Sequence, residues 1–100
     1  MYYLYILYAT TADKYYVGYT DNVQRRLTEH NTSERNTYTS KFRPWELKAI
    51  YQIGSGLNDA VRIERYIKRQ KSRALLEHLI VGGELYGILA QLVRVPQLRD

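Results

Sequence analysis

The chain has 100 residues, which is the usual size of one domain and leaves no room for two. The absence of cysteine excludes disulfide scaffolds, thiolate zinc sites and cysteine nucleophiles. A net charge of +5 favours a polyanionic partner. The apolar beginning lacks the basic segment and cleavage site of a signal peptide, and no stretch approaches the roughly 20 apolar residues of a membrane span. We therefore expect a cytoplasmic protein with no membrane partner.

The first twenty residues predict two neighbouring strands. Residues 2 to 8 are aromatic or aliphatic on both alternating faces, which is the pattern of a strand buried on both sides. The small and polar residues 9 to 14 predict a turn, and residues 15 to 20 repeat the strand pattern. Strands this close in sequence pair most simply as an antiparallel hairpin.

A helix is expected after the hairpin. Asp21 offers an N-cap, and Gln24 stands three residues later in the capping-box position. Val23 and Leu27 are four residues apart and give the helix its buried stripe. We expect the helix to end near His30, because the following residues are polar and show no periodicity, which predicts a loop.

The second half of the chain predicts one more strand and further helices. Residues 45 to 53 alternate well enough for a third strand. Asn58 can cap a long helix that runs to about residue 71, and Ser72 restarts another helix whose leucines recur at helical spacing. The apolar residues 85 to 93 predict a further short helix. The order is ββαβα plus a C-terminal helix, an α+β fold with a small three-stranded antiparallel sheet flanked by helices.

Several short fragments follow one another in an order typical of one enzyme family. Tyr3-Leu4-Tyr5 and Tyr16-Val17-Gly18 resemble the two halves of the GIY-YIG endonuclease signature, and their key tyrosines are eleven positions apart, as is typical of that family. The resemblance covers residues 2 to about 80 and is to the small stand-alone, single-domain branch, whereas the tail from about residue 82 is unmatched. The further matching fragments are Gly18-Tyr19-Thr20, Arg25-Arg26-Leu27, His30-Asn31, Tyr38-Thr39, Arg43-Pro44-Trp45 and Ala60 with Glu64, Ile67 and Lys68.

This resemblance implies a metal-dependent endonuclease that hydrolyses phosphodiester bonds in nucleic acid, with Mg²⁺ or Mn²⁺ as cofactor. The resemblance favours DNA as the substrate, and the sequence itself does not choose between DNA and RNA. A domain without an appended DNA-reading module should prefer branched or single-stranded DNA, as in repair and recombination. The nuclease domain would span residues 1 to 80. Residues 81 to 100 would form a helical extension or tail packed on it, through which a homodimer or a partner protein could bind. Two alternatives stay open: a non-catalytic nucleic-acid-binding module, and a nuclease subunit that is active only with a partner.

The resemblance also implies roles for individual side chains. Glu64 is the candidate metal ligand, because Mg²⁺ often takes only one or two carboxylates and keeps most of its waters. Arg26 is the candidate phosphate clamp, because its planar guanidinium matches phosphate oxygens. Tyr5, Tyr16 and His30 are competing candidates for the general base, and the sequence does not choose among them.

Each of these side chains also has a purely structural interpretation. Glu64 could simply pair with Lys68 one helical turn later, Arg26 could belong to a solvated polar face, and most of the tyrosines should be core residues. The candidate nucleic-acid-binding residues are a glycine that keeps a strand end clear, a nearby threonine and basic side chains: Gly18, Thr20, Lys41, Arg43, Lys68, Arg69 and Lys71. The aromatic candidates for base stacking are Tyr38, Phe42 and Trp45, the last of which we expect in the core.

Overall fold

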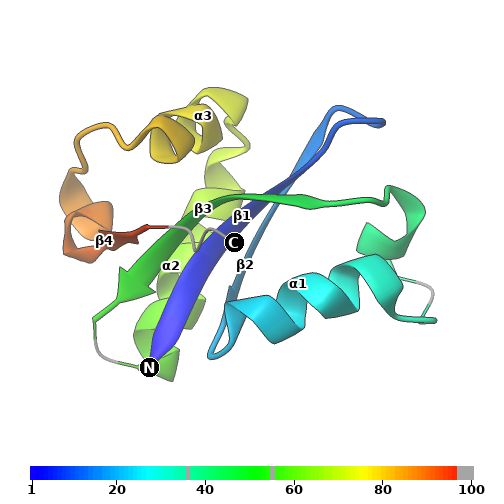
Figure 1. Ribbon diagram of the computed structural model, residues 1–100. Coiled ribbons are helices and arrows are strands. Elements are labelled where there is room, and N and C mark those ends of the chain that lie inside the picture. Colours follow the sequence, from blue (N-terminus) through cyan, green and yellow to red (C-terminus); the bar gives the residue numbers. More distant parts are fainter. Residues whose placement is uncertain (36, 55, 97–100) are drawn as a thin grey trace.

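The computed structural model describes residues 1–35, 37–54 and 56–96, which form an antiparallel sheet covered by helices (Figure 1). Its elements in chain order are β1 (Tyr2–Ala9), β2 (Lys14–Thr20), α1 (Val23–Thr32), the 3₁₀ helix η1 (Thr39–Lys41), β3 (Glu46–Ile53), α2 (Leu57–Gln70), α3 (Arg73–Val81), the 3₁₀ helix η2 (Gly87–Gln91) and β4 (Val93–Val95). No helix in these ranges is long and apolar enough to cross a membrane.

The first two strands form the predicted antiparallel hairpin. β1 pairs with β2 so that Tyr5 lies opposite Gly18 and Leu7 opposite Tyr16. β3 pairs with the other side of β1, which places β1 inside the sheet and leaves β2 at its edge. Because β1 is covered on both faces, both sets of its alternating side chains are apolar or aromatic.

Two separate cores hold the helices onto the sheet. On one face, Ile6 packs with α2 and α3, whose inward residues include Ile63. On the other face, Tyr5 packs in a cluster with Trp45 and with Leu27 of α1. Figure 1 shows this division, with α1 on one side of the strands and α2 on the other. Trp45 is 2% exposed, which confirms that it belongs to the core.

The N-caps of α1 and α2 differ from the predicted ones. Asn22 caps α1, because its extended backbone lets the side chain accept a hydrogen bond from the backbone N–H of Arg25 at 3.0 Å. Asp21 lies one residue too early for this and instead binds the Arg25 guanidinium at 2.8 Å. α2 begins at Leu57 after Gly56, so Asn58 lies inside the first turn and is not the cap.

Beyond α2, one prediction is confirmed and another holds only in part. Ser72 caps α3 as predicted, with its hydroxyl accepting from the backbone N–H of Leu75 at 3.1 Å. The apolar tail, however, is not simply a helix: after η2 it forms β4, whose Val95 lies opposite Ile50 of β3. The sheet in the described ranges therefore has four strands and not three. A strand of three residues is too short to produce a visible alternation, and it forms because β3 offers it a free edge.

Candidate active site

The predicted site residues meet at the β2 edge of the sheet, where elements from both faces come together. Tyr5 and Tyr16 lie on β1 and β2 with ring centroids 6.3 Å apart, and the His30 ring of α1 lies 4.9 Å from the ring of Tyr16. Burial raises the pKa of Tyr5 above its usual range; the phenol of Tyr16 adds to this effect, the positive charge of Arg26 opposes it, and the negative charge of Glu64 reinforces it. Tyr5, Tyr16 and His30 are therefore in direct contact, and Arg26 and Glu64 lie near enough to act electrostatically on the Tyr5 phenol.

A buried hydrogen-bond chain fixes the centre of this cluster. The Tyr5 hydroxyl lies 2.8 Å from Nε2 of His30, and Nδ1 of the same ring lies 2.9 Å from the hydroxyl of Thr39. Tyr5, His30 and Thr39 are 1%, 4% and 5% exposed, so all three are shielded from solvent. The indole N–H of Trp45 donates to the backbone oxygen of Thr39 at 2.7 Å, and this contact holds Thr39 at the end of the hydrogen-bond chain. Both ring nitrogens of His30 thus have fixed partners.

His30 is neutral near pH 7. Burial lowers its pKa to about 4, and the positive charge of Arg26 acts in the same direction. A neutral imidazole has one nitrogen that donates and one that accepts. Its two hydroxyl neighbours, Tyr5 and Thr39, can each take either role, so the ring is fully satisfied without a charge.

Gly18 is explained by the ring that crosses it. A Cβ atom at this position would collide with the Tyr5 hydroxyl and lie 2.6 Å from Cζ of the same ring. The sequence predicted a glycine that keeps this part of the strand clear, and the group that needs the space is the phenol of Tyr5. The glycine therefore lets Tyr5 lie across the neighbouring strand and reach His30.

Arg26 lies at the mouth of the cluster. Its side chain is 41% exposed and donates to a carboxylate oxygen of Glu29 at 3.0 Å. It lines a pocket of about 520 Å³ together with Tyr16, His30 and Tyr38. Its neighbour Arg25 pairs with Asp21 at 2.8 Å and lies 3.9 Å from the other carboxylate oxygen of Glu29, but it does not line this pocket. Arg26 is thus the arginine of the pair that can reach a group bound beside the buried tyrosine.

Glu64 approaches the cluster from α2. Its carboxylate is 21% exposed and lies 3.6 Å from Nζ of Lys68, so the local pair expected from the sequence is present. Nζ of Lys68 in turn lies 5.0 Å from the centroid of the Tyr16 ring. The described part of the chain contains no group of three or more histidine, aspartate and glutamate side chains that could enclose a metal ion. A metal here would have Glu64 as its carboxylate ligand and water for much of the rest.

The predicted nucleic-acid-binding residues occupy different environments. The Arg43 guanidinium donates to the backbone oxygens of His30, at 2.7 Å, and Ser33, so it holds the C-terminal end of α1. The hydroxyl of Thr20 exchanges hydrogen bonds with the backbone of Asn22 and is 6% exposed. These two side chains support the fold around the site. The exposed basic residues of the set are Lys41, Lys68, Arg69 and Lys71.

Sequence reasoning missed the residues that position the histidine. The Asn31 side chain accepts from the backbone N–H of Trp45 at 2.7 Å and donates to its backbone oxygen at 3.0 Å. Thr39 supports His30 as described above. Asn31 and Thr39 both stood in matching fragments, but their partners lie fourteen and nine residues away. Only the folded chain brings them together.

Comparison with known proteins agrees with the geometry. The sequence profile of the GIY-YIG catalytic domain, a nuclease fold, matches residues 1–77. A UPF0213 protein of Limosilactobacillus reuteri is 38% identical over 82 residues, which cover 77% of this chain and 84% of the relative. The UPF0213 protein in the ldhD 5′ region of Pediococcus acidilactici is 33% identical over 85 residues, covering 82% and 84%, and one from Halobacterium salinarum is 43% identical over 65 residues, covering 65% and 82%. The resemblance predicted from the sequence is thereby confirmed, and the chain belongs to the GIY-YIG family.

Proposed function

We propose that this chain is a divalent-metal-dependent endonuclease that hydrolyses phosphodiester bonds in DNA and acts on single-stranded or branched substrates during repair or recombination. One observation carries the proposal: Tyr5 of β1, Tyr16 of β2 and His30 of α1 are in contact, and Glu64 of α2 is linked to them through Lys68, which lies over the Tyr16 ring. Phosphodiester hydrolysis requires an activated water, a cation beside the phosphate and an acceptor for the proton of the water. The cluster offers a side chain for each.

Tyr5 is the residue that we assign to proton transfer. Both nitrogens of His30 are hydrogen-bonded, to Tyr5 and to Thr39, so we assign His30 to orienting Tyr5 and to accepting its proton. When Tyr5 donates to Nε2, the Nδ1–H group of the ring donates to Thr39, and the Tyr5 oxygen keeps a lone pair for the water. As the water gives its proton to this oxygen, the proton of the phenol passes to Nε2. Because the pKa of Tyr5 is raised and that of His30 is low, neither ion accumulates at rest.

Glu64 fits the part of a metal ligand. Its carboxylate is partly buried, is held only at 3.6 Å by Lys68, and acts electrostatically on Tyr5. Mg²⁺ binds through one or two carboxylates while keeping several waters, so Glu64 alone can suffice as its protein ligand. When bound, such an ion supplies an acidified water and neutralises charge on the phosphate.

Arg26 is the group that we assign to the phosphate. Its ion pair with Glu29 joins two side chains that are 41% and 46% exposed, and such pairs contribute only about 0–1 kcal/mol. A phosphate in the pocket that Arg26 lines can therefore compete for the guanidinium, to which it can make two parallel hydrogen bonds.

The test is a cleavage assay on labelled single-stranded, duplex and branched DNA with Mg²⁺, Mn²⁺ or EDTA. The variant Glu64→Gln removes the proposed ligand. Glu46→Gln is the matched control, because Glu46 is also a carboxylate paired with a lysine, Lys48, at 3.2 Å. Metal-dependent cutting that is lost only in Glu64→Gln supports the nuclease and identifies the preferred DNA. Binding without cutting on every substrate would instead indicate a non-catalytic binding module, and cutting that needs an added protein would indicate a nuclease subunit.

A further inference from the structure

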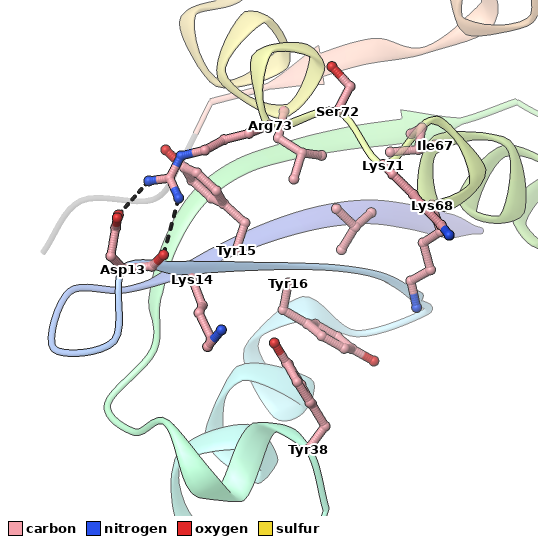
Figure 2. A pocket seen from close by; sticks show the side chains of 12 residues that line it. Asp13, Lys14, Tyr15, Tyr16, Tyr38, Ile67, Lys68, Lys71, Ser72 and Arg73 are labelled. Atoms are coloured by element: carbon pink, nitrogen blue, oxygen red, sulfur yellow. Dashed lines mark hydrogen bonds and ion pairs between the residues drawn. The ribbon is translucent and has the colours of Figure 1, made fainter.

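A second pocket adjoins the candidate active site along the β2 edge. It has a volume of about 370 Å³ and lies between the β1–β2 hairpin and the junction of α2 with α3 (Figure 2). Tyr16 and Tyr38 line this pocket and also the pocket that contains Arg26 and His30. These two tyrosines therefore separate the candidate active site from a neighbouring space that the proposed chemistry does not use.

The lining of this second pocket is basic, and we call it the lysine pocket. Lys14 enters it from the start of β2, and Lys68 and Lys71 enter from the end of α2. Figure 2 shows the ion pair of Arg73 with Asp13 on the opposite side from Lys68. Lys14 and Lys71, in contrast, form no ion pair with the described residues, and the Lys14 ammonium lies 5.3 Å from the centroid of the Phe42 ring. The pocket thus presents two lysine charges that an anion can neutralise.

Tyr38 offers a half-open aromatic surface at the border of the two pockets. Its ring lies nearly parallel to that of Tyr16, with centroids 6.5 Å apart at 29°, and it meets Phe42 edge-on at 5.2 Å. These contacts hold the ring, yet Tyr38 remains 51% exposed. A fixed and half-exposed aromatic ring of this kind stacks on unpaired bases, whereas the bases of an intact duplex are already stacked on one another.

We propose that the lysine pocket binds phosphates next to the cleaved bond in an unpaired DNA strand, and that Tyr38 stacks on a base of that strand. This inference rests on the proposed nuclease function. The scissile phosphate of this DNA strand would lie beside Arg26. The strand would then cross Tyr16 and Tyr38 and enter the lysine pocket. The site then selects unpaired DNA by stacking and holds it by charge, without reading a sequence.

The experiment measures binding, so that it does not depend on catalysis. Binding constants for a labelled twelve-nucleotide oligothymidylate and for a labelled duplex are measured by fluorescence anisotropy. The measurements are made in EDTA at a series of salt concentrations. The variants are Tyr38→Leu, Tyr38→Trp and the double variant Lys14→Ala/Lys71→Ala. The charge-matched control is Arg62→Ala/Arg65→Ala, which removes two arginines that line a different pocket on α2.

Tyr38→Leu should weaken oligothymidylate binding about tenfold or more and leave duplex binding unchanged, while Tyr38→Trp should retain binding. The double lysine variant should reduce the slope of log K against log salt by about 1.4, since each neutralised phosphate of a single strand contributes about 0.7. Unchanged single-strand binding in both sets of variants, or an equal loss in the arginine control, would overturn the proposal. Metal-dependent cleavage by the wild-type chain would still support the nuclease in that case, so the two failures can be told apart.

Discussion

At the scale of single residues, the site depends on one phenol that lies across a glycine. Tyr5→Phe removes the hydroxyl that we assign to proton transfer, and we expect cleavage to fall by about 10²–10⁴-fold. The buried Nε2 of His30 also loses its partner, which should lower the free energy of unfolding by about 1–3 kcal/mol. Single-turnover cleavage and urea unfolding measure the two effects.

Tyr51→Phe is the matched control for this variant. Tyr51 is 1% exposed, like Tyr5, and its hydroxyl donates to the backbone oxygen of Leu79 at 2.6 Å on the other face of the sheet. The Tyr51→Phe variant should keep its cleavage rate, and it should lose less stability because the Leu79 oxygen still accepts from the Arg94 guanidinium at 3.0 Å. Equal cleavage by Tyr5→Phe and the wild type would remove Tyr5 from the chemistry and leave Tyr16 as the base.

The buried histidine should make stability depend on pH in a particular direction. The pKa of His30 is about 4 in the folded chain and about 6.5 when unfolded, so between these values the unfolded chain binds a proton that the folded chain does not. The free energy of unfolding should therefore be highest above pH 6.5. It should decrease by about 3 kcal/mol in total as the pH falls toward 4.

Urea unfolding at a series of pH values checks this dependence. The variant His30→Gln should lose this pH-dependent decrease in the free energy of unfolding. The control His78→Gln, which changes an exposed histidine on α3, should retain the decrease. The assignment would be contradicted if His30→Gln retained the full dependence.

At the scale of elements, α1 is held in place by contacts at its C-terminal end. The Asn31 side chain pairs with both backbone groups of Trp45, so Asn31→Ala leaves the Trp45 N–H without its acceptor. We expect a loss of about 1–3 kcal/mol in the free energy of unfolding. Cleavage should fall as well, because His30 is the preceding residue. Asn58→Ala, at an exposed asparagine in the first turn of α2, should change stability by no more than about 0.5 kcal/mol.

The sequence predicted those elements whose signals are local. The hairpin, α2 and α3 were predicted because their periodicity lies within the element itself, and Ser72 also marked the start of α3, whereas Asn58 was not the cap of α2. The N-cap of α1 was misassigned by one residue, because Asp21 and Asn22 are both good caps and only the backbone decides between them. β4 could not be predicted, since three residues carry no period and its existence depends on the distant β3 edge.

The same distinction holds for the site. The five candidate residues could be named because the order of fragments resembled a family. The contacts that hold these residues in place could not be predicted, because they join segments that are distant in the sequence. These contacts are Thr39 with His30, Asn31 with Trp45, and the ring of Tyr5 over Gly18. Family resemblance thus indicated which residues to propose for the site, and tertiary structure was needed to explain what holds them in place.

At the scale of the whole molecule, the site exists only when both helical layers are attached to the sheet. Arg26 and His30 come from α1 on one face and Glu64 from α2 on the other, and β1 contributes side chains to both cores. A strand shared in this way should couple the two layers, so we expect a single cooperative unfolding transition. Loosening either layer should then destroy the site as a whole.

The single tryptophan makes this expectation measurable. Trp45 lies in the core on the α1 face, so its fluorescence reports that layer, whereas far-ultraviolet circular dichroism is dominated by all three helices, two of which lie on the opposite face. The urea midpoints of the two signals and of cleavage activity should coincide. A fluorescence transition at lower urea would mean that the α1 layer opens on its own while α2 and α3 remain folded. Cleavage would then follow the fluorescence, because His30 leaves Tyr5 when α1 detaches.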